Sequence, residues 1–132
     1  MSRYVSEELR RLVALRAGYC CEYCKFPENL AFFSFQVDHI ISIKHGGLND
    51  PDNLSWACYP CNMSKGSDVG TILFPDRAFV RLFNPRTDIW DDHFEFDNGV
   101  IRAKTKIGEA TVKVLRINQI ERVIERQGLD KT

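Results

Sequence analysis

The residues most able to do chemistry form two interleaved sets in the first half of the chain. Two Cys-x-x-Cys pairs bracket an Asp-His dipeptide, and an asparagine follows the last cysteine. In chain order these residues are Cys21, Cys24, Asp38, His39, Cys58, Cys61 and Asn62. Thiolates suit structural zinc, whereas carboxylate and amide oxygens suit Mg²⁺ or Mn²⁺ beside a histidine that can accept a proton. Together the two sets predict metal-assisted hydrolysis of a phosphodiester.

The cysteine pairs predict one structural Zn²⁺ ion held by four thiolates. A Cys-x-x-Cys turn brings two sulfurs to one ion, and the strands expected between the pairs return the chain to it. In a reducing compartment such paired motifs hold metal more often than they form disulfides. The alternative is a redox or disulfide protein with four buried or reactive cysteines. Cys20 lies outside both motifs and is expected to have no metal role.

Asp38 and Asn62 are the candidate ligands of a catalytic ion, and His39 is the candidate general base. Mg²⁺ takes one or two protein oxygens and keeps several waters, and a neutral imidazole can deprotonate a water. Adjacent residues of a strand point to opposite faces, so Asp38 and His39 can serve one site only if the strand ends or distorts there. The Gly46-Gly47 loop that follows favours such an ending.

Composition and length are those of an ordinary globular protein. The chain has 132 residues, of which 44% are hydrophobic and 27% charged, and this length predicts one domain. The net charge of zero and the pI of about 6.8 count against a strongly basic nucleic-acid binder but allow a local positive groove. No apolar run approaches the roughly 18 residues of a membrane span, and the N-terminus lacks a signal-peptide pattern. We therefore expect a cytoplasmic protein that does not bind membranes.

Periodicity and turn residues predict the elements that must position these groups. In the first half they predict a helix capped by Ser6, a strand at 32–41, a loop at 44–52, a strand at 54–57 and a short helix from Pro60 to Gly66. In the second half they predict a hairpin at 93–104, a helix at 107–115, and a terminal helix that begins at Asn118 with a capping box. The Phe and Trp side chains are expected mainly in the core.

Three short motifs occur in order between residues 18 and 67. They are Val37-Asp-His-Ile-Ile-Ser-Ile-Lys-His-Gly-Gly, Asp52-Asn-Leu, and Cys58-Tyr-Pro-Cys-Asn-Met-Ser-Lys-Gly66. In this combination the chain resembles the HNH endonuclease family, in the branch that carries a four-cysteine zinc knuckle on a ββα-metal core. The second half resembles, more loosely, the tails of small stand-alone bacterial HNH proteins.

The resemblance implies roles for individual positions. His39 matches the general base, and Asp38 matches the metal-binding acid before it. Asn53 matches the middle asparagine, which holds the loop between the strands and helps to orient the base. Asn62 matches the last motif position, where many members have histidine, so this chain is an H-N-N variant; its neutral oxygen donor fits Mg²⁺ or Mn²⁺. Lys65 follows Asn62 by one helical turn and is a candidate phosphate contact.

The expected protein is a single α+β domain over residues 1–132. A nuclease core at 18–67 follows an N-terminal helix, and an extension at 71–132 adds a hairpin and helices packed on the core. The expected activity is hydrolysis of phosphodiester bonds in double-stranded DNA by a monomer or homodimer, and the resemblance implies 5′-phosphate and 3′-hydroxyl ends. The alternative is a zinc-knuckle module that binds nucleic acid without catalysis. No helix carries an evident base-reading set, so the sequence predicts no specificity.

Overall fold

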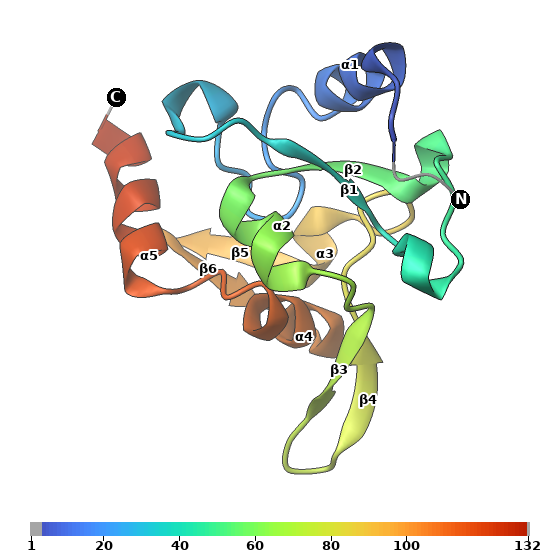
Figure 1. The fold of residues 1–132 in the computed structure, drawn as a ribbon. Coiled ribbons are helices and arrows are strands. Elements are labelled where there is room, and N and C mark those ends of the chain that lie inside the picture. The colour runs from blue at the N-terminus through green and yellow to red at the C-terminus, as the bar shows by residue number, and fades with distance from the viewer. Residues whose placement is uncertain (1–3, 132) are drawn as a thin grey trace.

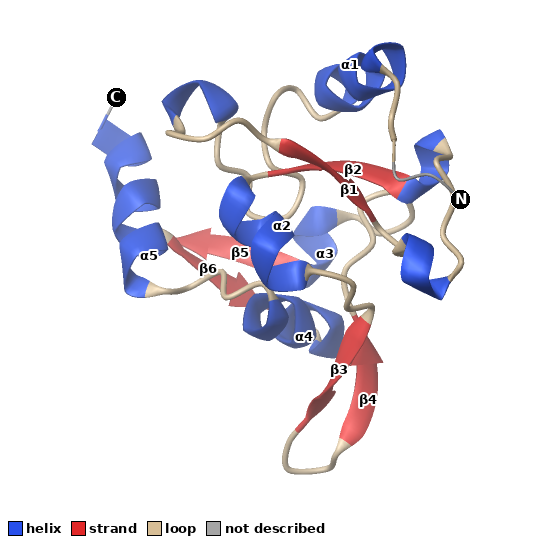
Figure 2. Cartoon of the chain, in the orientation of Figure 1, coloured by secondary structure: helices blue, strands red, loops and turns tan. Residues whose placement is uncertain are grey.

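Helices and three two-stranded antiparallel sheets make up the part of the chain that the structure describes, residues 4–131 of a computed structural model (Figures 1 and 2). The strands are β1 (Gln36–His39), β2 (Leu54–Ala57), β3 (Gly70–Leu73), β4 (Ala78–Arg81), β5 (Phe94–Asp97) and β6 (Val100–Ala103). The helices are α1 (Glu7–Arg16), α2 (Tyr59–Lys65), α3 (Trp90–His93), α4 (Lys106–Val114) and α5 (Ile120–Gln127). This arrangement confirms the predicted α+β class.

A hairpin followed by a helix forms the centre of the first half. Strand β1 pairs antiparallel with β2, so that Asp38 lies opposite Ser55 and His39 opposite Leu54. Every residue of β2 is buried, which explains its continuous run of small and apolar side chains. Helix α2 begins directly after β2 and lies below the strand pair in the view of Figure 1. The ββα order predicted for this segment is therefore present.

Helix α1 lies over this hairpin. Ser6 caps it by accepting a hydrogen bond from the Leu9 backbone N–H at 3.1 Å, as the sequence predicts, and the acidic residues of the first turn face the positive end of the helix. Its inner face buries Val13 and Ala14. At the other end, the Arg16 side chain donates to the Leu54 carbonyl at 2.7 Å, which ties α1 to strand β2.

The second half confirms one hairpin and adds another. Strands β5 and β6 pair around Asn98 and Gly99, both with positive φ, which is the geometry that favours Asn-Gly in two-residue turns. The hairpin β3–β4 was not predicted and projects away from the body in Figure 1. Its strands are four residues each, as short as β5 and β6, but the residues that join them lack the Asn-Gly pair that marked the predicted hairpin.

Two predicted boundaries and part of the predicted core are wrong. The strand predicted at 32–41 is reduced to Gln36–His39, and Phe32 before it is 98% exposed. The N-cap position of the terminal helix is Gln119, whose side chain makes no capping bond. The Asn118 amide instead bonds the backbone N–H and carbonyl of Ile101 at 3.0 and 2.8 Å. A tertiary partner on β6 thus replaces the local capping box.

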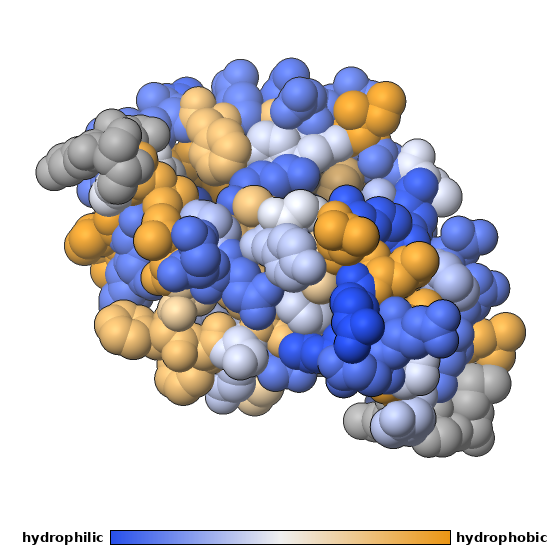
Figure 3. All heavy atoms as spheres, turned by 90° about the horizontal axis from the view of Figure 1, so that it is seen from above, coloured by the Kyte–Doolittle hydropathy of each residue, from blue (hydrophilic) through white to orange (hydrophobic). Residues whose placement is uncertain are grey.

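One apolar cluster runs through both halves of the chain, from Val13 on α1 to Ile117 after α4. Trp90 belongs to it and donates its indole N–H to the Tyr23 carbonyl at 2.9 Å. Seen from the α1 side, the remaining exposed apolar side chains lie in separate patches among polar ones (Figure 3). None of the described helices has the length and apolar character needed to span a bilayer.

Candidate active site and four-cysteine centre

The four predicted zinc ligands come together in one buried cluster. The sulfurs of Cys21, Cys24, Cys58 and Cys61 all lie within 4.8 Å of one another. In each Cys-x-x-Cys turn the first sulfur accepts the backbone N–H of the second cysteine at 3.4 Å. The first turn follows α1, and the second forms the start of α2, where Cys58 is the N-cap.

The chemistry of this donor set fits zinc. Four thiolates at a Zn–S distance of about 2.3 Å in a tetrahedron place their sulfurs about 3.8 Å apart, and the Cys24 and Cys58 sulfurs are 3.7 Å apart. No cysteine among the described residues forms a disulfide. Cys20 lies outside the cluster.

The candidate catalytic residues line one open depression of about 370 Å³. The lining residues are Val37, Asp38, His39, Ser42, Ile43, Asn62, Gly66 and Ser67. Strand β1 ends at His39, and the next residue, Ile40, donates its backbone N–H to the Asn53 carbonyl at 2.9 Å. The chain therefore turns where the sequence argument required it, and Asp38, His39 and Asn62 reach the same depression.

Asp38 is the most tightly held of these groups. Its side chain is buried at 4% exposure, and Oδ2 accepts hydrogen bonds from the Tyr23 hydroxyl at 2.8 Å and the Ser55 hydroxyl at 3.3 Å. Oδ1 accepts from the Lys65 ammonium at 3.2 Å. Burial raises the pKa of the Asp38 carboxyl, and these three partners oppose that rise without cancelling it.

Lys65 lies inside the protein, although the sequence suggested a phosphate contact. Its side chain is 2% exposed, because it leaves α2 on the face that packs against β1. The ammonium donates to the His39 carbonyl at 2.9 Å as well as to Asp38. In this arrangement Lys65 neutralises Asp38 and fixes the end of β1, and it does not point into solvent.

The imidazole of His39 is oriented by Asn49, a residue of the loop between β1 and β2. His39 Nε2 lies 2.7 Å from Asn49 Oδ1. The amide of Asn49 is itself oriented, since its Nδ2 donates to the Tyr4 carbonyl at 2.7 Å. An amide oxygen only accepts hydrogen bonds, so Nε2 carries the proton and Nδ1 carries the lone pair.

Asn53 fastens the same loop, which is the role that the resemblance implies for it. Its side-chain oxygen accepts the Ile41 backbone N–H at 2.9 Å, and its Nδ2 donates to the carbonyls of Ile41 and Leu48 at 2.9 and 3.0 Å. Gly47 passes so close to this clamp that an added Cβ would lie 1.7 Å from the Ile41 carbonyl oxygen. Asn53 thus holds the two ends of the loop that carries Asn49 together, and only a glycine fits at position 47 beside these bonds.

The oxygen donors of the depression fit a hard divalent cation. A carboxylate oxygen has two lone-pair directions, and Asp38 Oδ1 uses one of them for Lys65. Asn62 supplies a neutral amide oxygen, and no other described side chain bonds that amide. One carboxylate and one amide oxygen, with water, match the sparse protein ligation that Mg²⁺ prefers.

Residues 21–68 match the sequence model of the HNH endonuclease family. The chain carries an HNH domain. A curated relative, the Septu protein PtuA of Bacillus mycoides (strain KBAB4), is 31% identical over 96 residues, which is 64% of this chain but 13% of that relative. No solved structure gives a significant match. The HNH domain indicates a nuclease-related function.

Sequence reasoning missed three partners of the HNH site. Asn49 reads as an ordinary loop residue next to Asp-Pro, and Tyr23 and Ser55 read as residues between motif positions. None of the three is a motif position, and only folding brings its polar atom to His39 or Asp38. The pairing of strand residues offered the one available signal, because Ser55 faces Asp38 in register.

Proposed function

We propose that this HNH domain is a metal-dependent endonuclease that hydrolyses phosphodiester bonds in DNA, with His39 as the general base. The observation that carries the proposal is the depression in which Asp38, His39 and Asn62 meet. Its polar groups have the types and the arrangement that water-mediated phosphodiester hydrolysis needs: oxygen donors for a cation, and an oriented imidazole.

His39 supplies the proton acceptor. Asn49 binds the Nε2 side of the ring, which leaves the Nδ1 lone pair to take a proton from a water that attacks phosphorus. Asn53 does not contact the half-buried ring, but its bonds to the Ile41 and Leu48 backbone fasten the loop that carries Asn49. A base held in one tautomer and one orientation loses little entropy on reaching the transition state.

Asp38 and Asn62 would hold the catalytic ion, Mg²⁺ or Mn²⁺, whose charge stabilises the phosphoryl oxygens and the departing 3′ oxygen. Tyr23, Ser55 and Lys65 keep the Asp38 carboxylate in one position. Lys65 also brings a positive charge to the ligand carboxylate, so we expect the site to bind its cation weakly in the absence of DNA. The phosphate oxygens of the substrate would then complete the coordination.

The proposal is tested with supercoiled plasmid incubated with purified protein and Mg²⁺ or Mn²⁺, with and without EDTA. Nicked or linear DNA that depends on the divalent ion supports the endonuclease. A single-stranded RNA of matched length, run in parallel, shows whether DNA is preferred. Binding to DNA without cleavage in any divalent ion contradicts the proposal and favours a zinc-knuckle binding module.

A further inference from the structure

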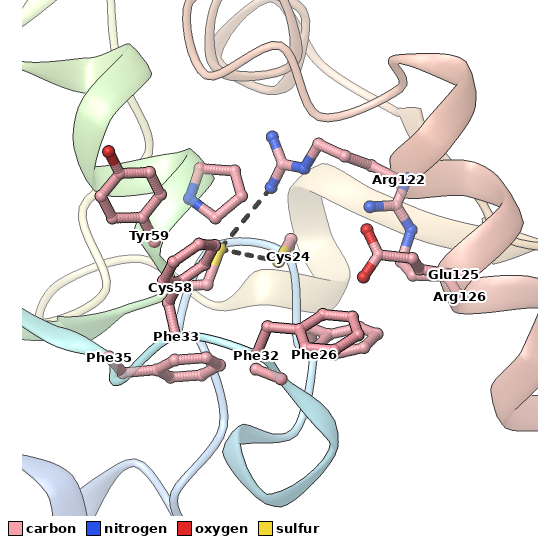
Figure 4. A pocket seen from close by; sticks show the side chains of 12 residues that line it. Cys24, Phe26, Phe32, Phe33, Phe35, Cys58, Tyr59, Arg122, Glu125 and Arg126 are labelled. Carbon is pink, nitrogen blue, oxygen red and sulfur yellow. Dashed lines mark hydrogen bonds between the residues drawn. The ribbon is translucent and has the colours of Figure 1, made fainter.

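Arg122 on helix α5 points into the four-cysteine cluster from the far end of the chain. Its side chain is 7% exposed, and Nη2 donates to the Cys61 sulfur at 2.9 Å and lies 3.7 Å from the Cys58 sulfur. Figure 4 shows the guanidinium extended from α5 toward Cys58, beside Cys24. The residue lies well beyond the segment 21–68 that matches the HNH family.

The charge of a loaded centre explains why a cation belongs there. Four thiolates and one divalent ion carry a net charge of −2, and such a charge is costly inside a protein unless a buried counter-charge or hydrogen bonds compensate it. Among the described side chains, Arg122 is the cation that hydrogen-bonds the sulfurs.

The other end of the guanidinium holds the chain before α5. Nη1 donates to the carbonyls of Leu115 and Arg116 at 2.7 and 3.0 Å, which are the first two carbonyls after helix α4. One side chain therefore joins the cysteine cluster, the end of α4 and helix α5.

We propose that Arg122 is the counter-charge of the four-cysteine metal centre, and that it couples the docking of α5 to the presence of the metal. Such coupling is reciprocal. Arg122 slows loss of the ion, and the ion holds α5 against the core. This inference rests on the fit of the cysteine cluster to zinc and is independent of the nuclease proposal.

Arg126 provides a matched control one helical turn along α5. It is buried at 4% exposure and donates to the Gly99 and Ile117 carbonyls and to the Asn118 amide oxygen. Its three side-chain hydrogen bonds compare with four for Arg122, and none of the three reaches a sulfur. Substitution of either arginine should therefore loosen α5 in general, whereas only substitution of Arg122 should act through the charge on the sulfurs.

The first test measures the rate at which reduced, zinc-loaded protein gives up its ion to an excess of a colorimetric chelator. Arg122→Gln should release zinc about 10–100-fold faster than the unaltered protein, which is the usual effect of removing a partner of a metal ligand. Arg122→Lys should fall between the two, and Arg126→Gln should stay near the unaltered rate. Equal acceleration by Arg122→Gln and Arg126→Gln, or a purified protein that binds no zinc, would overturn the proposal.

A second measurement needs no variant, and so it remains decisive if Arg122→Gln does not fold. Amide hydrogen exchange of the unaltered chain is followed while the chelator removes zinc. Exchange in α5 should rise before exchange in α1, because α1 packs on β1 and β2 and does not bond the sulfurs. Simultaneous loss of protection in both helices, or loss in α1 first, contradicts a specific coupling to α5.

Discussion

At the scale of single residues, the candidate site depends on polar side chains that hold the motif residues in place. The sequence identifies His39 as a motif residue, but its hydrogen bond to Asn49 determines which ring nitrogen keeps a lone pair for water. The orientation of the Asn49 amide is set in turn by its bond to the Tyr4 carbonyl. Asp38 likewise depends on Tyr23. Residue identity and order predicted the motif residues. Their hydrogen-bond partners could not be predicted, because they are adjacent to the motif residues in space and belong to no motif.

Asn49→Ala is predicted to slow cleavage at saturating DNA by about 10–100-fold, a part of the 10²–10⁴-fold that general-base catalysis contributes. The ring of His39 then loses the bond that fixes its tautomer. Single-turnover rates on a short labelled duplex measure the effect, with thermal unfolding and zinc content as controls for folding. An unchanged rate would show that Asn49 does not orient the base.

Lys65→Met is predicted to destabilise the fold by about 3–5 kcal/mol, because it leaves the buried Asp38 carboxylate without its cation. Adding Asp38→Asn should recover part of this loss, since the neutral amide is less costly to bury. The free energies of unfolding in urea of the two single variants and the double variant give the interaction energy. Additive losses would mean that the two side chains do not stabilise each other, and would reopen a surface role for Lys65.

At the level of secondary structure, the loop between β1 and β2 is held by side-chain bonds from Asn53 and by the close approach of Gly47 to Ile41. The sequence predicted a polar, glycine-rich loop there, and resemblance predicted that Asn53 holds it; the structure places three Asn53 side-chain bonds within it. The short hairpin β3–β4 and the cap of α5 were missed, because tertiary contacts outweigh weak local signals in short elements.

Gly47→Ala should open this loop, because the added methyl overlaps the Ile41 carbonyl oxygen. The cleavage rate should fall by more than the loss of folded protein accounts for. Gly46→Ala is the matched control: Gly46 has open space around it but a φ of +92°, so a modest destabilisation of about 1 kcal/mol is expected with the loop contacts kept. Cleavage rate and urea unfolding are measured for both. Equal activity in the two variants would contradict a closed loop as a condition for catalysis.

At the scale of the whole molecule, the HNH segment and the segment that follows it share one interior. Trp90 bonds the Tyr23 carbonyl, and a Glu22–Arg86 ion pair and the Arg122 contact with Cys61 also join the two segments. These contacts support our proposal that residues 1–132 form one domain in which 71–132 packs on the core at 18–67. The sequence predicted the fold class and the packing of 71–132 on the core, but it did not predict these individual contacts, because no motif marks them.

A fragment that ends at residue 69 is therefore predicted not to fold stably, even with zinc, because Tyr23 and the buried cysteines lose much of their covering. Near-ultraviolet circular dichroism and amide exchange of the fragment, compared with the full chain, make the test. A fragment with a native-like near-ultraviolet signal and native-like amide protection would show instead that the core folds on its own.

The central claim is that His39 takes the proton from the attacking water, and one rate comparison tests it most directly. Single-turnover cleavage of a labelled duplex is measured in Mg²⁺ and in Mn²⁺ for the unaltered protein and for His39→Ala, after zinc content and unfolding midpoint have been shown to match. If His39 is the general base, the rate of the variant should fall by about 10²–10⁴-fold in both ions. A variant whose rate stays within about threefold of the unaltered protein, against the size expected for a lost general base, would contradict it.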